Sequence, residues 1–378
     1  MNLEISSISS TATLKKNNCR NVYHTIYSKG FSTKQDLANT LQLSLPTITH
    51  LLQDLRDREL IELSGHSDST GGRRPVNIKI VPTARISAGL EVLKEFARLI
   101  VVDLYGTPIL EKTLLLNFHK TDLYFDTLSN WVNDLIHKLP YPDEHVLGIG
   151  IALQGLLSPD GKELLFDHLL GSKVTIDDFT SRLNWPCSII HDVELAATAE
   201  ISLPGGLKNA FYLSLNRNMG SALISDGKVL TGSQNFSSTI EHMELIPGGR
   251  QCYCGKCGCV ETYCSANALS EDSGLELSDF FYRVRSGQEK ELQIWNRYLE
   301  NLARTIDNIR MIFRCDILIG GLVQTFMVPE DLTHIIARVN KLTFYKANDL
   351  NIRLSQYGEK ATAIGGGLTY IKPFLENI

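Results

Sequence analysis

The segment HMELIPGGRQCYCGKCGCVE, residues 242–261, carries one histidine and four cysteines around a Gly-rich turn. Soft thiolates and an imidazole this close in sequence can converge on one tetrahedral zinc ion. Five candidate ligands compete for four positions, and on spacing alone Cys257 could replace His242; the candidates are His242, Cys252, Cys254, Cys257 and Cys259. Four protein ligands leave no open coordination position, so the segment predicts one structural zinc ion per chain. The alternative is a loop of reduced cysteines, with several thiols open to oxidation.

The other four cysteines, at positions 19, 187, 264 and 315, are scattered and typical of small buried apolar residues. In a reducing compartment, a dense cysteine cluster favours metal over disulfides. No apolar run approaches the ~20 residues that span a bilayer, and the N-terminus lacks a basic-then-apolar leader. The sequence therefore predicts a cytoplasmic protein with no membrane partner.

Strand and helix patterns alternate on both sides of the cysteine segment. Paired strands are expected at 97–106 and 107–118, and a buried strand at 146–153. A further strand at 187–192 leads directly into an Ala-rich helix at 193–201. A second set follows Pro204, with strands at 210–215, 220–225, 228–233 and 316–321 and a long helix from about 290 to 313. This alternation indicates an α/β architecture, and no internal sequence repeat is visible.

The N-terminal residues follow a different pattern. The Ser- and Thr-rich start predicts a flexible tail, and a first helix is expected from about Asn18 to Gly30. Ser32 and Gln35 have capping-box spacing for a second helix, and a third is expected to start at Ser44 with Pro46 in its first turn. Residues 60–65 and 76–81 alternate like two strands around the basic, Gly-rich stretch 66–75. The order predicts a winged helix-turn-helix.

Such a unit binds DNA by placing the first turns of its third helix in the major groove. Arg73 and Arg74 at the wing tip suit phosphate or minor-groove contact. Residues 15–80 hold ten Lys/Arg and six Asp/Glu, a net +4, which leaves −9 for the rest of the chain. The alternatives are ordinary charge variation and a winged helix used for protein contacts only. Because the charge is modest, affinity should depend on dimerisation. The base-contact candidates are Leu45, Pro46, Thr47, Thr49, His50 and Gln53.

From about Asn18 to the C-terminus the chain resembles the ROK family of repressors, open reading frames and kinases. The specific motif Cys-x-Cys-Gly-x-x-Gly-Cys-x-Glu is met by Cys252, Cys254, Gly255, Gly258, Cys259 and Glu261. Supporting matches are GRRP at 72–75, HDVELAATAE at 191–200, ILIGG at 317–321 and GEKATAIGGGL at 358–368. The resemblance favours His242 over Cys257 as the fourth zinc ligand.

The resemblance implies that the winged helix-turn-helix is followed by a two-lobed α/β actin-like domain of the ribonuclease H-like, sugar-kinase type. The expected division is a tail at 1–14, a DNA-binding domain at 15–81, a first lobe at 82–200 completed by a C-terminal helix at 361–378, and a second lobe at 201–360 with the zinc loop.

Kinases of this family bind ATP through glycine-rich phosphate loops, and here both depart from the pattern. Glu91 takes the acidic position of the first, followed by Leu93, Lys94 and Glu95 instead of the small residues. The second spans 218–222 and keeps only Gly220. Bulky side chains and added negative charge oppose close backbone approach to phosphate, so we expect no kinase activity.

The sugar pocket implied by the resemblance is partly kept. Asp192, His242 and Glu261 match, whereas His191 replaces an Asn and Thr239 stands where the family has a Glu. Asp192 resembles the kinases' general base, but without phosphate loops it is expected to hydrogen-bond a ligand. Alternatively, Asp192 could be the N-cap of the following helix, and His191 could be a histidine of the core.

The leading hypothesis is a transcriptional regulator, expected to be a repressor of carbohydrate genes. A homodimer or dimer of dimers would bind double-stranded operator DNA, switched by a sugar, a sugar derivative or a protein partner. The alternatives are a sugar kinase with an appended DNA-binding domain and an effector-independent DNA-binding protein.

Overall fold

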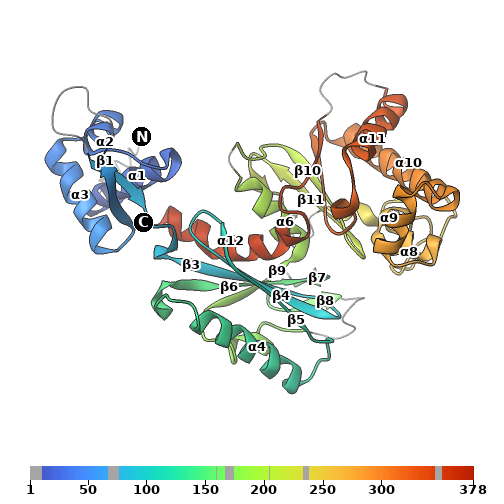
Figure 1. Cartoon of the computed structure of the whole chain (residues 1–378), viewed down its shortest axis with the longest axis horizontal. Helices are drawn as coiled ribbons and strands as arrows, with labels where there is room; N and C mark the ends of the chain where they lie inside the picture. The colour runs from blue at the N-terminus through green and yellow to red at the C-terminus, as the bar shows by residue number, and fades with distance from the viewer. Residues whose placement is uncertain are drawn as a thin grey trace, which may run out of the picture.

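The computed structural model describes residues 11–66, 76–158, 160–166, 174–203, 205–232, 238–344 and 351–378. A small N-terminal unit lies at one end of the molecule, and two large β-sheets, one small two-stranded sheet and their helices form the rest of the described chain (Figure 1). None of the helices in these ranges combines the length and apolar character needed to cross a membrane.

The N-terminal unit consists of three helices and a two-stranded antiparallel sheet. Its apolar side chains point inward from every helix, with Ile26, Leu37 and Leu55 fully buried. The elements are α1 (Thr11–Lys29), α2 (Lys34–Leu41), α3 (Leu45–Asp57), β1 (Ile61–His66) and β2 (Val76–Ile80). Three helices followed by a strand hairpin is the order of elements that the sequence predicted.

Two local predictions in this unit were wrong. Helix α1 begins at Thr11, not near Asn18, and therefore overlaps the expected tail. Its first turns present exposed side chains such as Leu14, so no apolar periodicity marked them. The capping box of α2 is formed by Thr33 and Asp36, one residue later than expected, because Ser32 is instead bridged to Ile78 of β2. Ser44 does cap α3.

The first large sheet has the strand order β5-β4-β3-β6-β9. Strands β3, β4 and β5 form antiparallel pairs, whereas β6 and β9 add in parallel. Helix α4 (Asp122–His137) covers the outer face through Leu128 and Val132. The strands are β3 (Ile86–Val92), β4 (Phe96–Val102), β5 (Pro108–Leu115), β6 (Val146–Leu153) and β9 (Cys187–His191). The shorter elements are η1 (Pro82–Ala84), η2 (Asp143–His145), β7 (Leu156–Leu157), β8 (Leu164–Phe166) and α5 (Asp177–Thr180).

The second large sheet has the order β12-β11-β10-β13-β14. As in the first sheet, the first two pairs in this order are antiparallel and the last two are parallel. Its strands are β10 (Ala210–Leu215), β11 (Met219–Ser225), β12 (Lys228–Val229), β13 (Asp316–Gly320) and β14 (Ile352–Leu354). Helices pack on its outer face, and the predicted long helix is α10 (Glu289–Ile312). The others are α7 (Glu261–Cys264), α8 (Ala266–Ser273), α9 (Leu277–Arg285) and α11 (Pro329–Leu342), with η3 (Ile240–His242), η4 (Val323–Phe326) and η5 (Gly358–Lys360).

Helices α6 (Asp192–Ile201) and α12 (Ala361–Glu376) lie between the two sheets. Their small residues permit backbone contact: a Cβ on Gly89 of β3 would overlap the Ala363 carbonyl, and one on Gly150 of β6 would overlap the Gly366 carbonyl. The apolar side chains of this layer run on into the core of the N-terminal unit as one cluster. The layer therefore joins all three parts of the chain. Together the two sheets and this layer have the two-lobed actin-like fold that the sequence predicted.

Candidate metal centre and carboxylate cluster

Four side chains of the cysteine segment meet at one point. The ligand atoms of His242, Cys252, Cys254 and Cys259 all lie within 4.8 Å of one another. The Cys252 Sγ atom is 3.7 Å from His242 Nδ1, and the Cys254 and Cys259 Sγ atoms are also 3.7 Å apart. One imidazole and three thiols at this spacing form a donor set that can hold a soft divalent metal ion.

The turn that gathers these ligands is fixed by backbone hydrogen bonds. The Cys252 N–H donates to the Lys256 carbonyl, and the Gly258 N–H donates to the Arg250 carbonyl. Cys257 points away from the cluster: it is exposed, and its Sγ lies 3.3 Å from Gln251 Oε1. Of the five candidate ligands, the structure therefore brings together the four that the resemblance favoured.

Four acidic side chains from different elements form a second feature, the carboxylate cluster: Glu91 of β3, Asp192 of α6, Glu241 of η3 and Glu261 of α7. Burial raises the pKa of Glu91 to about 7 and that of Glu241 to about 8. Repulsion from the Asp192 carboxylate contributes to both of these pKa shifts and repulsion from Glu261 to that of Glu241, while the Arg98 guanidinium lowers the pKa of Glu91. Geometry places three of the four around the start of β11: Glu261 bonds to Met219, Glu241 bonds to Ser221, and Val193, next to Asp192, packs against Gly220. The repulsion between Glu91 and Asp192 indicates that Glu91 of β3 faces the same region.

Asp192 is the first residue of α6, directly after β9, and is only 8% exposed. Its Oδ1 accepts a hydrogen bond from the Val193 N–H at 2.8 Å. Burial raises the pKa of this carboxyl, although the neighbouring His191 opposes the shift. The N-cap position itself belongs to His191, whose side chain does not cap the helix. The His191 Nδ1 is buried, lies 3.7 Å from Asp192 Oδ1 and has no hydrogen-bond partner.

Glu261 follows the last cysteine of the metal cluster by two residues and is 4% exposed. Its Oε2 accepts a hydrogen bond from the Met219 N–H at 2.7 Å, where β11 begins. Burial raises the pKa of Glu261 to about 7. The metal turn thus holds a carboxyl at the start of β11.

Sequence reasoning singled out Thr239 and overlooked Glu241. In the structure Thr239 is exposed at the start of η3, whereas the Glu241 carboxylate turns inward and accepts a hydrogen bond from Ser221 Oγ at 3.2 Å. Thr239 is the N-cap residue before η3, and Glu241 is the second residue of that turn. The family has a Glu at the position of Thr239, and this chain has a Glu two residues later. That nearby carboxylate was the signal that could have revealed Glu241.

The two segments that stand where family kinases have phosphate loops lie at tight hairpin turns. Leu93, Lys94 and Glu95 form the turn between β3 and β4, and most of 218–222 belongs to strand β11. The Glu95 carboxylate accepts a hydrogen bond from Arg217 at 2.9 Å, so an ion pair joins the β3–β4 turn to the β10–β11 turn. Beside the first hairpin, the Arg98 guanidinium contacts Glu91 at 3.5 Å and Glu359 at 3.2 Å.

Helix α3 presents a polar face to solvent. Pro46, Thr49, His50 and Gln53 are exposed and Thr47 is half-buried, while Ile48, Leu51 and Leu55 face the core. Some of the polar groups are already paired: Thr47 Oγ1 lies 2.8 Å from Ser44 Oγ, and Gln53 donates to Asp57 at 2.6 Å. The wing residues Arg73 and Arg74 lie outside the described residues.

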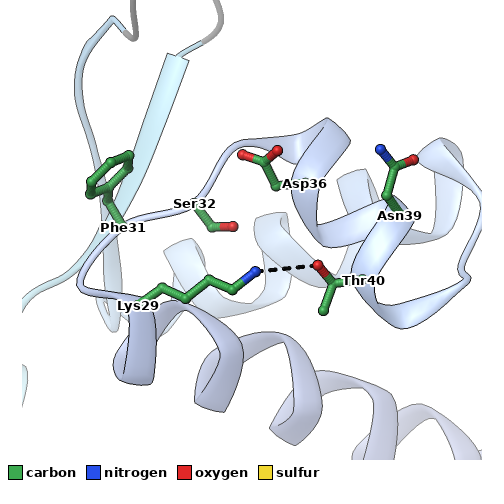
Figure 2. A pocket seen from close by; sticks show the side chains of 6 residues that line it. All are labelled: Lys29, Phe31, Ser32, Asp36, Asn39 and Thr40. Carbon is green, nitrogen blue, oxygen red and sulfur yellow. Dashed lines mark hydrogen bonds between the residues drawn. The ribbon is translucent and has the colours of Figure 1, made fainter.

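An open hollow of about 320 Å³ lies between the end of α1 and the outer face of α2. Figure 2 shows Lys29 reaching across it to donate to Thr40 Oγ1 at 3.3 Å, with Asp36 and Asn39 above. Its lining carries charges of both signs, and Asp36 is committed to the capping box of α2. The hollow belongs to the helical unit and is separate from the carboxylate cluster.

Residues 88–371, about three-quarters of the chain, match the sequence model of the ROK family. The chain belongs to the ROK family. Similar proteins include the xylose repressor of Bacillus spizizenii, 25% identical over 380 residues that cover 96% of this chain and 97% of that protein. The DNA-binding transcriptional dual regulator NagC of Escherichia coli K12 is 26% identical over 277 residues, 72% of this chain and 68% of NagC.

Two solved ROK structures show the same fold. A ROK family transcriptional regulator described as a homologue of Escherichia coli Mlc superposes with a TM-score of 0.76 at 20% identity, covering 96% of this chain and 97% of that one. A ROK glucokinase from Streptomyces griseus, solved with glucose and AMPPNP, gives 0.68 at 17% identity and covers 76% of this chain and 99% of its own. The ROK kinase fold therefore accounts for only part of this chain.

Proposed function

We propose that this ROK protein is a sugar-responsive transcriptional repressor without kinase activity. The observation that carries the proposal is a three-helix unit with a strand hairpin, N-terminal to a sugar-kinase fold. The xylose repressor and the Mlc-homologue regulator each cover 96% of this chain, whereas the glucokinase covers 76% of it. The xylose repressor and NagC relatives support regulation of carbohydrate genes by a sugar or sugar derivative.

The operator-binding surface is the exposed face of α3 together with the wing. Thr49, His50 and Gln53 offer hydrogen-bonding groups to base edges in the major groove, and Arg73 and Arg74 bind phosphate or the minor groove. The N-terminal units of two subunits would bind two half-sites of double-stranded DNA, so the active form is a homodimer or a dimer of dimers. Pro46 and Thr47 lie in the first turn of α3 and determine how this helix enters the major groove.

The effector-binding residues are the carboxylate cluster and its neighbours. Asp192, Glu241 and Glu261 accept hydrogen bonds from sugar hydroxyls, and His191 offers an unpaired ring nitrogen. His242 contributes from the edge of the metal turn. Thr239 is exposed and its side chain does not cap η3, so Glu241 supplies the carboxylate in its place.

The metal is one structural Zn²⁺ per chain, held by His242, Cys252, Cys254 and Cys259. Neutral imidazole and thiolate donors in a closed set of four favour zinc over harder ions. Bound there, zinc fixes the turn that carries Glu241 on one side and Glu261 on the other.

The ion pair between the two hairpin turns supports the proposed absence of kinase activity. The Glu95–Arg217 ion pair lies across the two turns where phosphate loops would be needed, and Glu95 would repel a nucleotide's phosphates. A coupled ATP-consumption assay with a hexose panel tests this alternative: turnover of ATP would overturn the assignment.

DNA binding is tested with the full chain and genomic fragments that it selects. The double substitution Arg73→Ala and Arg74→Ala should weaken binding on every fragment and flatten its salt dependence, because phosphate contacts release counterions. The matched control is Lys138→Ala with Lys341→Ala, two exposed cations of the α/β body. An unchanged salt slope in the wing variant removes the wing from the interface, and failure to select any DNA overturns the proposed function.

A further inference from the structure

The C-terminal helix α12 touches the N-terminal unit at its end. The Nε2 atom of His24, on α1, lies 3.1 Å from the carbonyl oxygen of Leu375, to which it donates as the Nε2–H tautomer. The Arg85 guanidinium lies 5.8 Å from the centre of the Phe374 ring. In Figure 1 the helix runs along the first sheet and brings the C-terminus beside the N-terminal unit.

A second contact between α1 and the body lies next to the first. The Tyr27 hydroxyl donates to the Leu104 carbonyl at 2.9 Å, and its ring stacks on Tyr105 with centroids 4.4 Å apart. Leu104 and Tyr105 form the turn after β4, and Leu368 of α12 packs against Gly106 in the same turn. We call the His24, Tyr27, Tyr105 and Leu375 contacts the α1 joint.

The other end of α12 lies against the elements that carry the carboxylate cluster. Gly365 packs so closely on α6 that a Cβ there would overlap the Leu195 carbonyl. A Cβ on Gly366 would come within 2.8 Å of both the Gly150 carbonyl oxygen and Gly89 Cα. Glu91 lies two residues after Gly89 on β3, and Asp192 opens α6 three residues before Leu195.

We propose that α12 is the coupling element that carries a change at the carboxylate cluster to the DNA-binding unit through the α1 joint. At Gly365 and Gly366 the packing is backbone to backbone, with no side chain between the elements to absorb a shift, so a displacement of α6 or β3 is passed directly to α12. At its far end the α1 joint adds two hydrogen bonds and one ring stack to the shared apolar core, and these contacts can be exchanged for others at low cost. The inference rests on the proposed function and specifies how the effector regulates DNA binding.

The first experiment measures coupling directly. The operator affinity of the full chain is determined with and without the sugar that most raises its melting temperature among D-xylose, D-glucose and N-acetyl-D-glucosamine. In the wild type the ratio of the two dissociation constants should be about tenfold, within the usual range of allosteric factors. The joint variant, His24→Ala with Tyr27→Phe, should reduce the ratio to within about twofold of unity while its sugar affinity is kept.

The matched control makes the same two residue changes away from the joint, as His119→Ala with Tyr282→Phe, both exposed on the body. It should retain the wild-type ratio. A joint variant that also retains the ratio overturns the coupling role of α12. A wild type whose DNA affinity no sugar changes contradicts the proposed function instead, so the two failures are distinguishable.

A second readout requires neither DNA nor sugar. Gly366→Ala forces α12 away from β3 and β6, and the coupling role predicts altered hydrogen exchange in α1, whose residues are not among the nearest neighbours of Gly366. Thr369→Ala on the same helix, whose hydroxyl donates to the Gly365 carbonyl within α12, is the control. Exchange that changes in α12 but stays at wild-type rates in α1 overturns the proposal. If Gly366→Ala does not fold, the joint variant is measured in the same way and should show faster exchange in α1.

Discussion

The two large sheets share one pattern of parallel and antiparallel strand pairs, yet they are used differently. The first is covered on its outer face by α4, and the second by α8 to α11, with the metal turn leading to a contact at the start of β11. Each contributes a tight hairpin, and the Glu95–Arg217 pair joins the two. The same topology thus supplies a plain lobe and an elaborated one, and the carboxylate cluster takes residues from both.

The difference between the lobes indicates which elements supply the ligand-contacting carboxylates. The shared strands and the α6–α12 layer create the frame, while Glu241 and Glu261 come from the elaboration of the second lobe. Glu91 and Asp192 come from the frame itself. If this division holds, a change to the metal turn of the elaborated lobe should have the largest effect and a change to the ion pair between the lobes the smallest.

Breaking the metal turn should affect the second lobe most. Cys259→Ser removes a fully buried member of the proposed zinc ligand set, and a structural zinc ion stabilises small zinc-finger peptides by about 10–16 kcal/mol. The variant should lose bound zinc, measured by mass spectrometry, and melt at a lower temperature. Cys257→Ser, which changes the exposed cysteine outside the cluster, should keep both zinc and melting temperature. Loss of zinc in the Cys257 variant instead would contradict the ligand assignment.

Truncating one core side chain in each lobe should have similar effects despite their different covers. Leu302→Ala in α10 and Leu128→Ala in α4 each remove a fully buried side chain, at a cost of about 2–5 kcal/mol. Because α12 packs on the first sheet, α6 packs on the second and the two helices pack on each other, each variant should melt in one transition, shifted down. Two separate calorimetric transitions would show that the lobes unfold independently.

The buried Glu91 should make stability depend on pH. Its folded pKa of about 7 lies above the ordinary value, so the folded state favours the protonated form. That contribution is complete below about pH 4.5 and is lost as the pH rises through 7, by up to about 3 kcal/mol. Glu91→Gln lacks this loss, so the difference between its melting temperature and that of the wild type should shift in favour of the variant as the pH rises from 5 to 8. The exposed Glu144→Gln should follow the wild type at every pH.

The ion pair between the hairpins should matter least for stability. Both partners are about half exposed, and such pairs contribute ~0.2–1 kcal/mol. Arg217→Ala and Glu95→Ala should each shift the melting temperature only slightly, and the double variant should show little coupling at high salt. A coupling energy well above this range, measured by a double-mutant cycle, would make the pair a structural lock between the lobes.

Much of the architecture could be predicted from local pattern. The α3 stripe of Ile48, Leu51 and Leu55, and the cysteine spacing that gathers the metal ligands, depend on neighbours in sequence. Errors arose where local pattern carried no signal: the exposed first turns of α1, and the cap at Thr33, which moved because Ser32 pairs with β2 across the unit.

The sequence by itself determined the three-helix unit, the α/β alternation and the metal segment, because capping, periodicity and ligand spacing are short-range properties. Only the tertiary structure decided that Glu241 rather than Thr239 turns inward, that the two lobes share a strand pattern, and that α12 reaches from the carboxylate cluster to α1. These depend on contacts between residues far apart in the chain, such as Gly89 with Ala363 and His24 with Leu375, and no local pattern encodes them.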